Sequence, residues 1–511
     1  MKNPYEHDWL EDEVRVGRTG QWFVFVVFLL FLIVPAVSLI VPSLRPKANV
    51  APPSSLRDRL IAWEKSAKTL PLFDQWRRRD QYRMTAGPGT GNAKVFAGEN
   101  GWLYYRPDLE AITGKGPDHL EPPSVAREKA AKAWQPPLPV IRDFAAQLAE
   151  RDIRLVFVPV PTKPMLCRKG LGLDQGTSIP PAWSRVANDL AVAGIGFVDL
   201  FPVIAARGPD QERFLKQDTH WTPGTMEAAA REVAARVSPE VALTVPRFEA
   251  IQRKGPGDLV GMLDFENGEK PIFAPEEVEL RKPSVPPVEA DGDVVLLGDS
   301  FVNVFEDPSL GFGEAGETTI GAGFASHFAA ALGRPVQTIA INGGGATAVR
   351  EAFARLPAAR LAGVKTVVWV LSSRDVLLPE IPARRAGIEW RSVTLPKAET
   401  TPVVATSIAA RELVGALVER SRIEDPTQTP YAEAVFSTVF KTDDGSEHFV
   451  FFWGFRKRQL EPSAGIEPGR RYRLKVMPFE KNAAASRATR LDDLFRPDLE
   501  PVFAESFEPL P

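Results

Sequence analysis

The sequence predicts an α/β fold in which a parallel sheet is flanked by helices, with an N-terminal transmembrane helix and a small C-terminal all-β domain. Short apolar segments alternate with helical segments through the middle of the chain, as in a parallel sheet covered on both faces. A long uncharged segment near the N-terminus has the length of a membrane span. From about residue 389 onward, strand-like segments separated by turns replace the helical periodicity.

The sheet is expected to consist of short, continuously apolar strands. These lie at 154–160, 196–200, 294–297, 336–341 and 366–371, and helical segments lie at 140–150, 224–237, 322–332 and 346–356. Upstream, residues 95–105 read VFAGENGWLYY, which predicts two short strands around a turn. In the C-terminal module, strands are expected at 403–409, 434–441, 448–454 and 472–477.

The uncharged segment covers residues 22–41 and reads WFVFVVFLLFLIVPAVSLIV. The apolar stretch of a cleaved signal peptide is usually only about 7–15 residues long and ends at a small-residue site, and no such site follows here. We therefore predict an uncleaved anchor. Basic residues flank both of its sides, so their count does not fix its direction. The chain then divides into a tail at 1–20, the anchor at 21–44, a spacer and helical segment at 45–94, an α/β domain at 95–388 and a β-rich module at 389–511.

Composition excludes some classes of function. A formal net charge of -3 and a pI near 6.1 give no electrostatic footprint for nucleic acid. The single cysteine, Cys167, excludes an intramolecular disulfide and a cysteine-rich metal site. No pair of histidines has the spacing of metal ligands, and no cofactor motif is present. We expect neither a metal nor a cofactor.

The first candidate for chemistry is Ser300, in the segment VVLLGDSF at 294–301. An apolar strand ends in Gly298, which permits a tight strand-to-helix bend that would expose the serine hydroxyl at the carboxyl edge of the sheet. Backbone N–H groups at such a turn are placed to receive an oxyanion. Gly-Asp-Ser turns are also common ends of ordinary strands, so this motif is weak on its own.

The second candidate is QDTHWT at 217–222. A nucleophilic serine needs a base, and the base needs a carboxylate to orient it. Asp218 and His220 are one residue apart, so in an extended chain their side chains leave on the same face. Thr222 is a predicted helix N-cap with Pro223 at the first helical position. The chain has five histidines, and the other four (His7, His119, His327 and His448) have sequence contexts less suited to a base.

Two further segments follow predicted strands. Asn342 and Gly343 begin a glycine-rich turn, which could be a phosphate cradle, an oxyanion loop or a plain tight turn; neither phosphate-binding pattern is present. Arg374 follows the next strand. Its sequence context leaves two roles open, a contact with substrate and a structural salt bridge.

These motifs together resemble the alginate O-acetyltransferases AlgJ and AlgX, members of the SGNH-hydrolase-like superfamily. GDSF follows an apolar strand, DTHW lies upstream of it, and VFAGENGWLYY resembles the start of the catalytic domain of that family. Ordinary SGNH enzymes carry the Asp-His element after the serine, whereas this family carries it first, as here. The resemblance covers roughly residues 95–379. The glycine turn at 342–345 matches the family only loosely, and the β-rich module does not match the carbohydrate-binding domain of AlgX.

The resemblance implies an SGNH-like fold with Ser300 as nucleophile, His220 as general base and Asp218 as the orienting acid. It implies acetyl transfer to an exported polysaccharide through an acetyl-serine intermediate. It places the catalytic domain in the bacterial periplasm, with the anchor in the inner membrane and the tail at 1–20 in the cytoplasm. It also implies a partner, a membrane-bound O-acyltransferase that supplies acetyl.

Two alternatives remain open. An SGNH-type carbohydrate acetylesterase would use the same three residues, which do not separate transfer from hydrolysis. A non-catalytic polysaccharide-binding assembly protein is the other alternative, and the joint presence of Asp218, His220 and Ser300 argues against it.

Overall fold

A computed structural model of the chain describes part of its residues. They are 18, 22–29, 33, 84–117, 135–173, 177–240, 242–263, 273–284, 292–356, 358–396, 411–423, 426, 431–492, 494, 496 and 499–510. The chain divides into two compact units, Met1–Met84 and Thr85–Pro511.

In the first unit, residues 22–29 and 33 are helical, and most of their apolar side chains, such as those of Trp22 and Phe23, are exposed. The rest of the predicted anchor at 21–44 and the helical segment expected within 45–94 lie outside the described residues. Among the residues that are described, no helix is long and apolar enough to cross a membrane.

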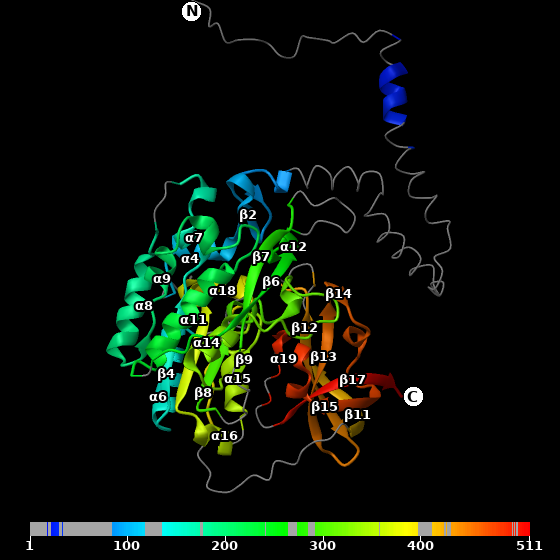
Figure 1. The fold of residues 1–511 in the computed structure, drawn as a ribbon. Helices are drawn as coiled ribbons and strands as arrows, with labels where there is room; N and C mark the ends of the chain where they lie inside the picture. Colours follow the sequence, from blue (N-terminus) through cyan, green and yellow to red (C-terminus); the bar gives the residue numbers. More distant parts are fainter. Residues whose placement is uncertain are drawn as a thin grey trace, which may run out of the picture. The chain divides into compact units, whose positions relative to one another are not determined.

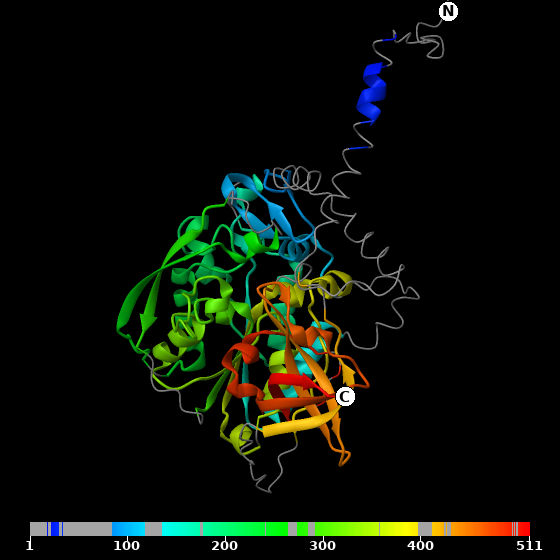
Figure 2. The same cartoon turned by 90° about the vertical axis from the view of Figure 1, so that its right-hand side faces the viewer.

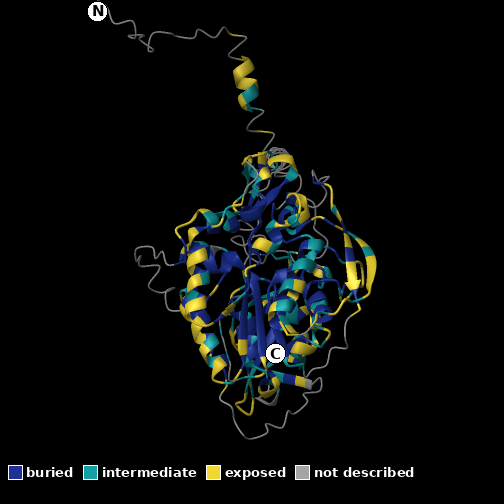
Figure 3. Cartoon of the chain, turned by 60° about the vertical axis from the view of Figure 1, so that its left-hand side comes forward, coloured by how far each residue is buried: buried dark blue, intermediate teal, exposed yellow. Residues whose placement is uncertain are grey.

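The second unit is built around a parallel five-stranded sheet with the order β5-β4-β10-β8-β9. The strands are β4 Arg154–Val160, β5 Gly196–Phe197, β8 Val294–Gly298, β9 Gln337–Ala340 and β10 Thr366–Ser372. All residues of β8 and β10 are buried, because helices cover both faces of the sheet (Figures 1 and 3). The predicted parallel sheet is therefore confirmed, and each expected strand is present.

Helices connect the strands and alternate with them along the chain. Their bounds are α4 Arg106–Thr113, α6 Pro137–Ala149, α7 Lys163–Leu166, α8 Pro181–Val192, α9 Phe201–Ala205, α10 Asp210–Arg213, α11 Pro223–Val237, α12 Asp258–Met262, α13 Ser300–Asn303, α14 Phe324–Leu332, α15 Ala348–Ala354, α16 Ala358–Gly363, α17 Ser373–Leu377, α18 Glu380–Arg385 and α19 Ala483–Arg487. Like the strands, the helices predicted from periodicity are present, with ends that differ by a few residues.

Two small antiparallel sheets accompany the main sheet. One contains β1 Thr90–Gly91, β2 Val95–Ala97 and β3 Leu103–Tyr105, so the predicted pair of strands within 95–105 is confirmed. The other is a hairpin of β6 Phe248–Gly255 and β7 Glu276–Pro283, which the sequence analysis did not predict. It extends from the body of the unit, as Figure 2 shows in green.

The C-terminal module is a closed β-barrel. Its strands are β11 Arg411–Arg420, β12 Ala434–Thr442, β13 Glu447–Arg456, β15 Arg471–Pro478 and β17 Pro501–Pro509, with the short β14 Gln459–Leu460 and β16 Thr489–Leu491 added at its rim. Pairing runs from β12 through β11, β15 and β17 to β13, and β13 pairs again with β12, so the circuit closes. Closure leaves no long unpaired edge.

The barrel strand β12 is buried on both faces. Phe436 and Phe440 lie in one buried cluster, while Val435 and Val439 lie in another that includes Ala485 of α19. Because adjacent strand residues point to opposite faces, α19 covers the outer face of β12. The strands predicted at 434–441, 448–454 and 472–477 are confirmed, and the segment 403–409 lies outside the described residues.

The α/β core extends past the expected boundary at residue 388. Trp390 and Leu395 are buried in the same hydrophobic cluster as the central sheet. The barrel also contacts the α/β core directly: the Asn342 N–H donates to the Arg487 carbonyl at 3.0 Å, and the Thr489 hydroxyl donates to the Asn342 carbonyl at 2.9 Å. The barrel is therefore attached beside the carboxyl end of β9.

Candidate active site

Ser300 is the first residue of α13, directly after β8 ends at Gly298. A Cβ placed on Gly298 would lie 2.8 Å from Val302 Cβ, so only glycine lets the strand bend this tightly into the helical turn. Ser300 is 2% exposed and lies at the carboxyl end of the sheet. The expected strand, bend and helical turn are therefore present, but the serine is buried rather than exposed.

Asp299 stabilises the bend with both carboxylate oxygens. Oδ1 accepts the N–H of Phe301 as the N-cap of α13, at 2.8 Å, and Oδ2 accepts the N–H of Ser372 at the end of β10, also at 2.8 Å. Burial raises the pKa of Asp299, and these N–H groups act in the opposite direction. Asp299 thus fixes the position of Ser300 relative to the neighbouring strand.

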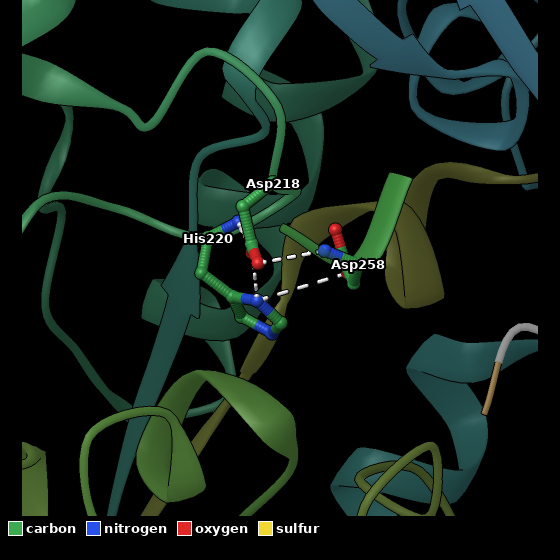
Figure 4. Close-up of side chains that lie close together, drawn as sticks. All are labelled: Asp218, His220 and Asp258. Carbon is green, nitrogen blue, oxygen red and sulfur yellow. Dashed lines mark hydrogen bonds and ion pairs between the residues drawn. The ribbon is translucent and has the colours of Figure 1, made fainter. Parts of the chain in front are cut away.

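Asp218 and His220 form a buried hydrogen-bonded pair (Figure 4). His220 Nδ1 lies 2.5 Å from Asp218 Oδ1, and the same oxygen accepts the His220 backbone N–H at 2.9 Å. The side chains are 3% and 0% exposed. The expected contact across one intervening residue is therefore present, and it leaves the other ring nitrogen, Nε2, to face the rest of the site.

The loop that carries this pair is held at both of its ends. Phe214 and Trp221 form an antiparallel β-bridge, and Thr222 is the N-cap of α11, accepting the Thr225 N–H at 3.3 Å. The buried ammonium of Lys163 donates to the carbonyls of Leu103, Leu215 and Lys216 at 2.6, 2.9 and 3.1 Å. Three acceptors use all the donors of an ammonium, so Lys163 fastens this loop to β3.

A second carboxylate, Asp258, lies at the same imidazole. Its Oδ2 is 3.8 Å from His220 Nδ1, and its backbone N–H donates to Asp218 Oδ2 at 2.9 Å. Gly257 makes this approach possible: its φ is +76°, and a Cβ there would lie 2.6 Å from the Gln217 carbonyl carbon. Sequence reasoning missed Asp258, although the Pro-Gly turn immediately before it was a visible signal of a close backbone approach.

The ionisation of these groups is strongly perturbed. Burial favours the neutral forms of Asp218 and His220, but their mutual attraction and hydrogen bonds outweigh burial, so the pKa of Asp218 is lowered and that of His220 is raised. Burial, with repulsion from Asp218, raises the pKa of Asp258 to about 6. The imidazole therefore sits in an anionic environment that stabilises its protonated form.

The same three side chains are close enough to share a cation, since their candidate ligand atoms lie within 4.8 Å of one another. These atoms already make hydrogen bonds, however. Asp258 Oδ1 accepts the Thr219 N–H at 2.8 Å, and Oδ2 accepts the Thr219 hydroxyl at 2.5 Å. The 2.5 Å contact between His220 and Asp218 also leaves no space for an ion between those two atoms. The arrangement fits an oriented base better than a metal centre.

Ser300 and the His–Asp pair come from different segments and meet through Phe301. The rings of His220 and Phe301 pack with centroids 4.8 Å apart. Within the described part of the chain, His220 Nε2 is buried and has no hydrogen-bond partner. The Ser300 side chain hydrogen-bonds with that of Tyr431.

The other candidate residues from the sequence differ in whether they line the pocket at Ser300. Gly343 and Arg374 line the same small pocket as Ser300, with a volume of about 30 Å³. Asn342 is not among its lining residues: its side chain accepts from Asn303 Nδ2 at 2.8 Å and its backbone binds the barrel. A larger cleft of about 900 Å³, between β9 and the barrel, is lined by Asn303 but not by Ser300.

Arg374 is engaged in a buried ion pair. Its NH1 lies 2.7 Å from Asp108 Oδ1, and its Nε lies 3.6 Å from Asp375 Oδ1. Burial lowers the pKa of Arg374, but the two carboxylates outweigh it and raise that pKa further above the ordinary range. The structural salt bridge considered from the sequence is thus present, at a position that also borders the pocket.

The remaining histidines lie elsewhere. His327 is buried in α14 and stacks on Phe248 at 5.7 Å between ring centroids, and His448 is in the barrel strand β13. His7 and His119 lie outside the described residues. Of the histidines that are described, His220 is the one that belongs to this site.

The fold and the site define an SGNH-like α/β domain. Residues 95–373, more than half of the chain, match the family described as "SGNH hydrolase-like domain, acetyltransferase AlgX". The chain belongs to this family.

Curated relatives include proteins named probable alginate O-acetylase AlgJ. That of Pseudomonas aeruginosa is 23% identical over 231 residues, 43% of this chain and 54% of the relative. That of Pseudomonas syringae pv. tomato is 27% identical over 227 residues, 42% and 53% of the respective chains. The chain thus spans about half the length of these relatives.

The solved structures to which the chain is similar include those of proteins named AlgJ and AlgX. The O-acetyltransferase domain of Pseudomonas putida AlgJ is 24% identical, covers 55% of this chain and 91% of that one, and has a TM-score of 0.39. Pseudomonas aeruginosa AlgX is 14% identical, covers 72% and 84%, and has a TM-score of 0.40.

Proposed function

We propose that this protein is a polysaccharide O-acetyltransferase that carries acetyl as an ester of Ser300 and passes it to a sugar hydroxyl. Membership of an acetyltransferase family and relatives named as alginate O-acetylases support acetyl transfer. The observation that carries the catalytic assignment is the buried pair in which Asp218 holds His220 Nδ1 at 2.5 Å, while Nε2 has no partner among the described residues. Such an imidazole is oriented to accept a proton at Nε2.

The proposed reaction has two halves. In the first, His220 Nε2 takes the proton of the Ser300 hydroxyl as Oγ attacks the acetyl carbonyl of a donor ester. The leaving group departs with that proton, and acetyl-Ser300 remains. In the second, a sugar hydroxyl gives its proton to His220 and attacks the acetyl carbon, and Ser300 leaves and recovers the proton. Asp218 stabilises the imidazolium that forms in each half.

We further propose that the acceptor is an exported polysaccharide and that the catalytic domain works in the bacterial periplasm, tethered through the apolar segment at 22–41. A membrane-bound O-acyltransferase would bring acetyl across the inner membrane. Family membership and the apolar segment support this arrangement. A pull-down with the full-length chain from membranes, followed by mass spectrometry, tests for that partner.

The test of the catalytic proposal uses full-length protein in detergent with p-nitrophenyl acetate as donor and bacterial exopolysaccharides, alginate among them, as acceptors. Mass spectrometry follows acetyl on the sugar. We expect acetylation by wild type, loss of it in Ser300→Ala, and retention in Ser309→Ala, which removes an exposed hydroxyl of the next helical turn. Acetate release without sugar acetylation would identify an esterase. Wild-type activity in Ser300→Ala would refute the assignment of the nucleophile.

A further inference from the structure

Tyr431 reaches the Ser300 pocket from outside the family domain. That domain ends at residue 373, whereas Tyr431 lies just before the barrel strand β12, which begins at Ala434. The Ala432 carbonyl next to it accepts the Arg458 N–H at 2.9 Å. The barrel therefore holds the backbone that presents this tyrosine.

The ring of Tyr431 is seated between the two strand ends that form the site. It lines the pocket with Ser300 and Gly343, and its side chain hydrogen-bonds with that of Ser300. The φ of Gly343 is +71°, and a Cβ there would lie 3.1 Å from the Tyr431 hydroxyl oxygen. The glycine thus provides both the left-handed backbone and the space that the phenol occupies.

Three polar side chains that lie in or beside this pocket are engaged in interactions of their own. The Asn342 amide bonds Asn303 and points toward Asp307. Arg374 is paired with Asp108. The Thr219 hydroxyl donates to Asp258. Tyr431 lines the same pocket, and its side chain hydrogen-bonds with that of Ser300.

We propose that Tyr431 is a catalytic residue supplied by the C-terminal barrel, and that its phenolic hydroxyl donates a hydrogen bond to the oxyanion formed when Ser300 attacks an acetyl group. This rests on the proposed acyl transfer at Ser300. The oxyanion is two bonds from Ser300 Oγ, so a phenol that already contacts the serine needs only a small shift to reach it. A preorganised donor in a water-poor site stabilises the transition state.

The electrostatics of the phenol agree with this role. Burial raises the pKa of Tyr431, and the nearby Arg374 opposes that effect only in part. The phenol is therefore protonated, and so remains a donor, throughout the neutral pH range. The proposed role of Tyr431 also explains how a β-rich module outside the family domain takes part in the reaction, because the module supplies a residue that completes the site.

The experiment compares full-length wild type, Tyr431→Phe and Tyr472→Phe in the hydrolysis of p-nitrophenyl acetate. Tyr472 is a matched control, because its hydroxyl accepts the Glu467 N–H at 3.0 Å within the barrel and lies outside the pocket. We expect Tyr431→Phe to lower kcat by about 10²- to 10³-fold, the effect of removing one oxyanion donor, with KM changed little. Tyr472→Phe should retain the wild-type kcat.

Two results would overturn the proposal. If Tyr431→Phe keeps the wild-type kcat, whether or not its melting temperature falls, the hydroxyl is structural. If kcat rises, the phenol merely blocks the serine. Ser300→Ala, assayed in parallel, distinguishes failure of the Tyr431 proposal from failure of the proposed reaction at Ser300. An inactive Ser300→Ala together with a fully active Tyr431→Phe refutes only the role of Tyr431. An active Ser300→Ala refutes the acyl-serine reaction itself.

Discussion

Asp258 Oδ2 lies 3.8 Å from His220 Nδ1, so this imidazole faces a second carboxylate besides that of Asp218. Burial alone would lower the pKa of His220, but Asp218 first and Asp258 after it raise it above its ordinary value of 6.5. In the proposed reaction His220 is the general base, which must be neutral to accept a proton. The acid limb of the pH–rate profile should therefore lie above pH 6.5, with activity increasing as pH rises through it.

Replacing Asp258 by asparagine should move this limb to lower pH. The Asp258→Asn variant keeps the backbone N–H that binds Asp218 but loses the charge that stabilises the imidazolium. Measurement of kcat/KM for p-nitrophenyl acetate between pH 5 and pH 8 tests this, with Asp443→Asn, an exposed acid in the barrel, as the control. A limb that stays in place, or moves to higher pH, would contradict the electrostatic role of Asp258.

Asp218→Asn should reduce kcat by roughly 10³- to 10⁴-fold while the fold persists. An amide carries no charge to stabilise the imidazolium, and it can orient the ring in the wrong tautomer. The circular dichroism spectrum should remain that of wild type. Residual activity within about tenfold of wild type would show that His220 does not depend on this carboxylate.

Gly298→Ala should destabilise the protein and displace Ser300, the proposed nucleophile, at the same time. The new methyl group would overlap Val302, and relief of this overlap shifts α13, which carries Ser300. Overpacking of this kind costs about 1–3 kcal/mol. Thermal melts should show a lower Tm, whereas Gly465→Ala, where a Cβ meets nothing within 4 Å, should melt like wild type. Additive effects of Gly298→Ala and Val302→Ala in the double variant would argue against the overlap as the cause.

Asp108→Ala should destabilise the fold more than the loss of any exposed ion pair. It removes the 2.7 Å partner of Arg374 and leaves a buried guanidinium with the more distant Asp375. Breaking a buried pair in this way costs about 3–5 kcal/mol. Urea titration would measure this loss, with Asp443→Ala, from the exposed pair with Arg471, as a control that should unfold like wild type. Equal stability of the two variants would show that the buried pair is replaceable.

Local patterns predicted the elements that carry Ser300 and His220. The strands β4 and β10 begin at the predicted residues, because continuous apolar runs bounded by polar residues define buried strands. The hairpin β6–β7 was missed because its outward faces are exposed and charged and its strands are some twenty residues apart in sequence. The barrel strand β17 was missed for a related reason, since its partners β13 and β15 are supplied by distant parts of the module.

The sequence by itself determined the local geometry of the two segments that carry the candidate site residues. Gly298 and Asp299 set the bend at Ser300, and Asp218 meets His220 across a single residue, so neighbouring residues suffice to define each arrangement. Only the tertiary structure decided that Asp258 joins the imidazole and that Tyr431 meets the serine. Asp258 is 40 residues from Asp218, and Tyr431 belongs to another module. Such contacts depend on how whole elements pack, and no local periodicity or turn propensity encodes them.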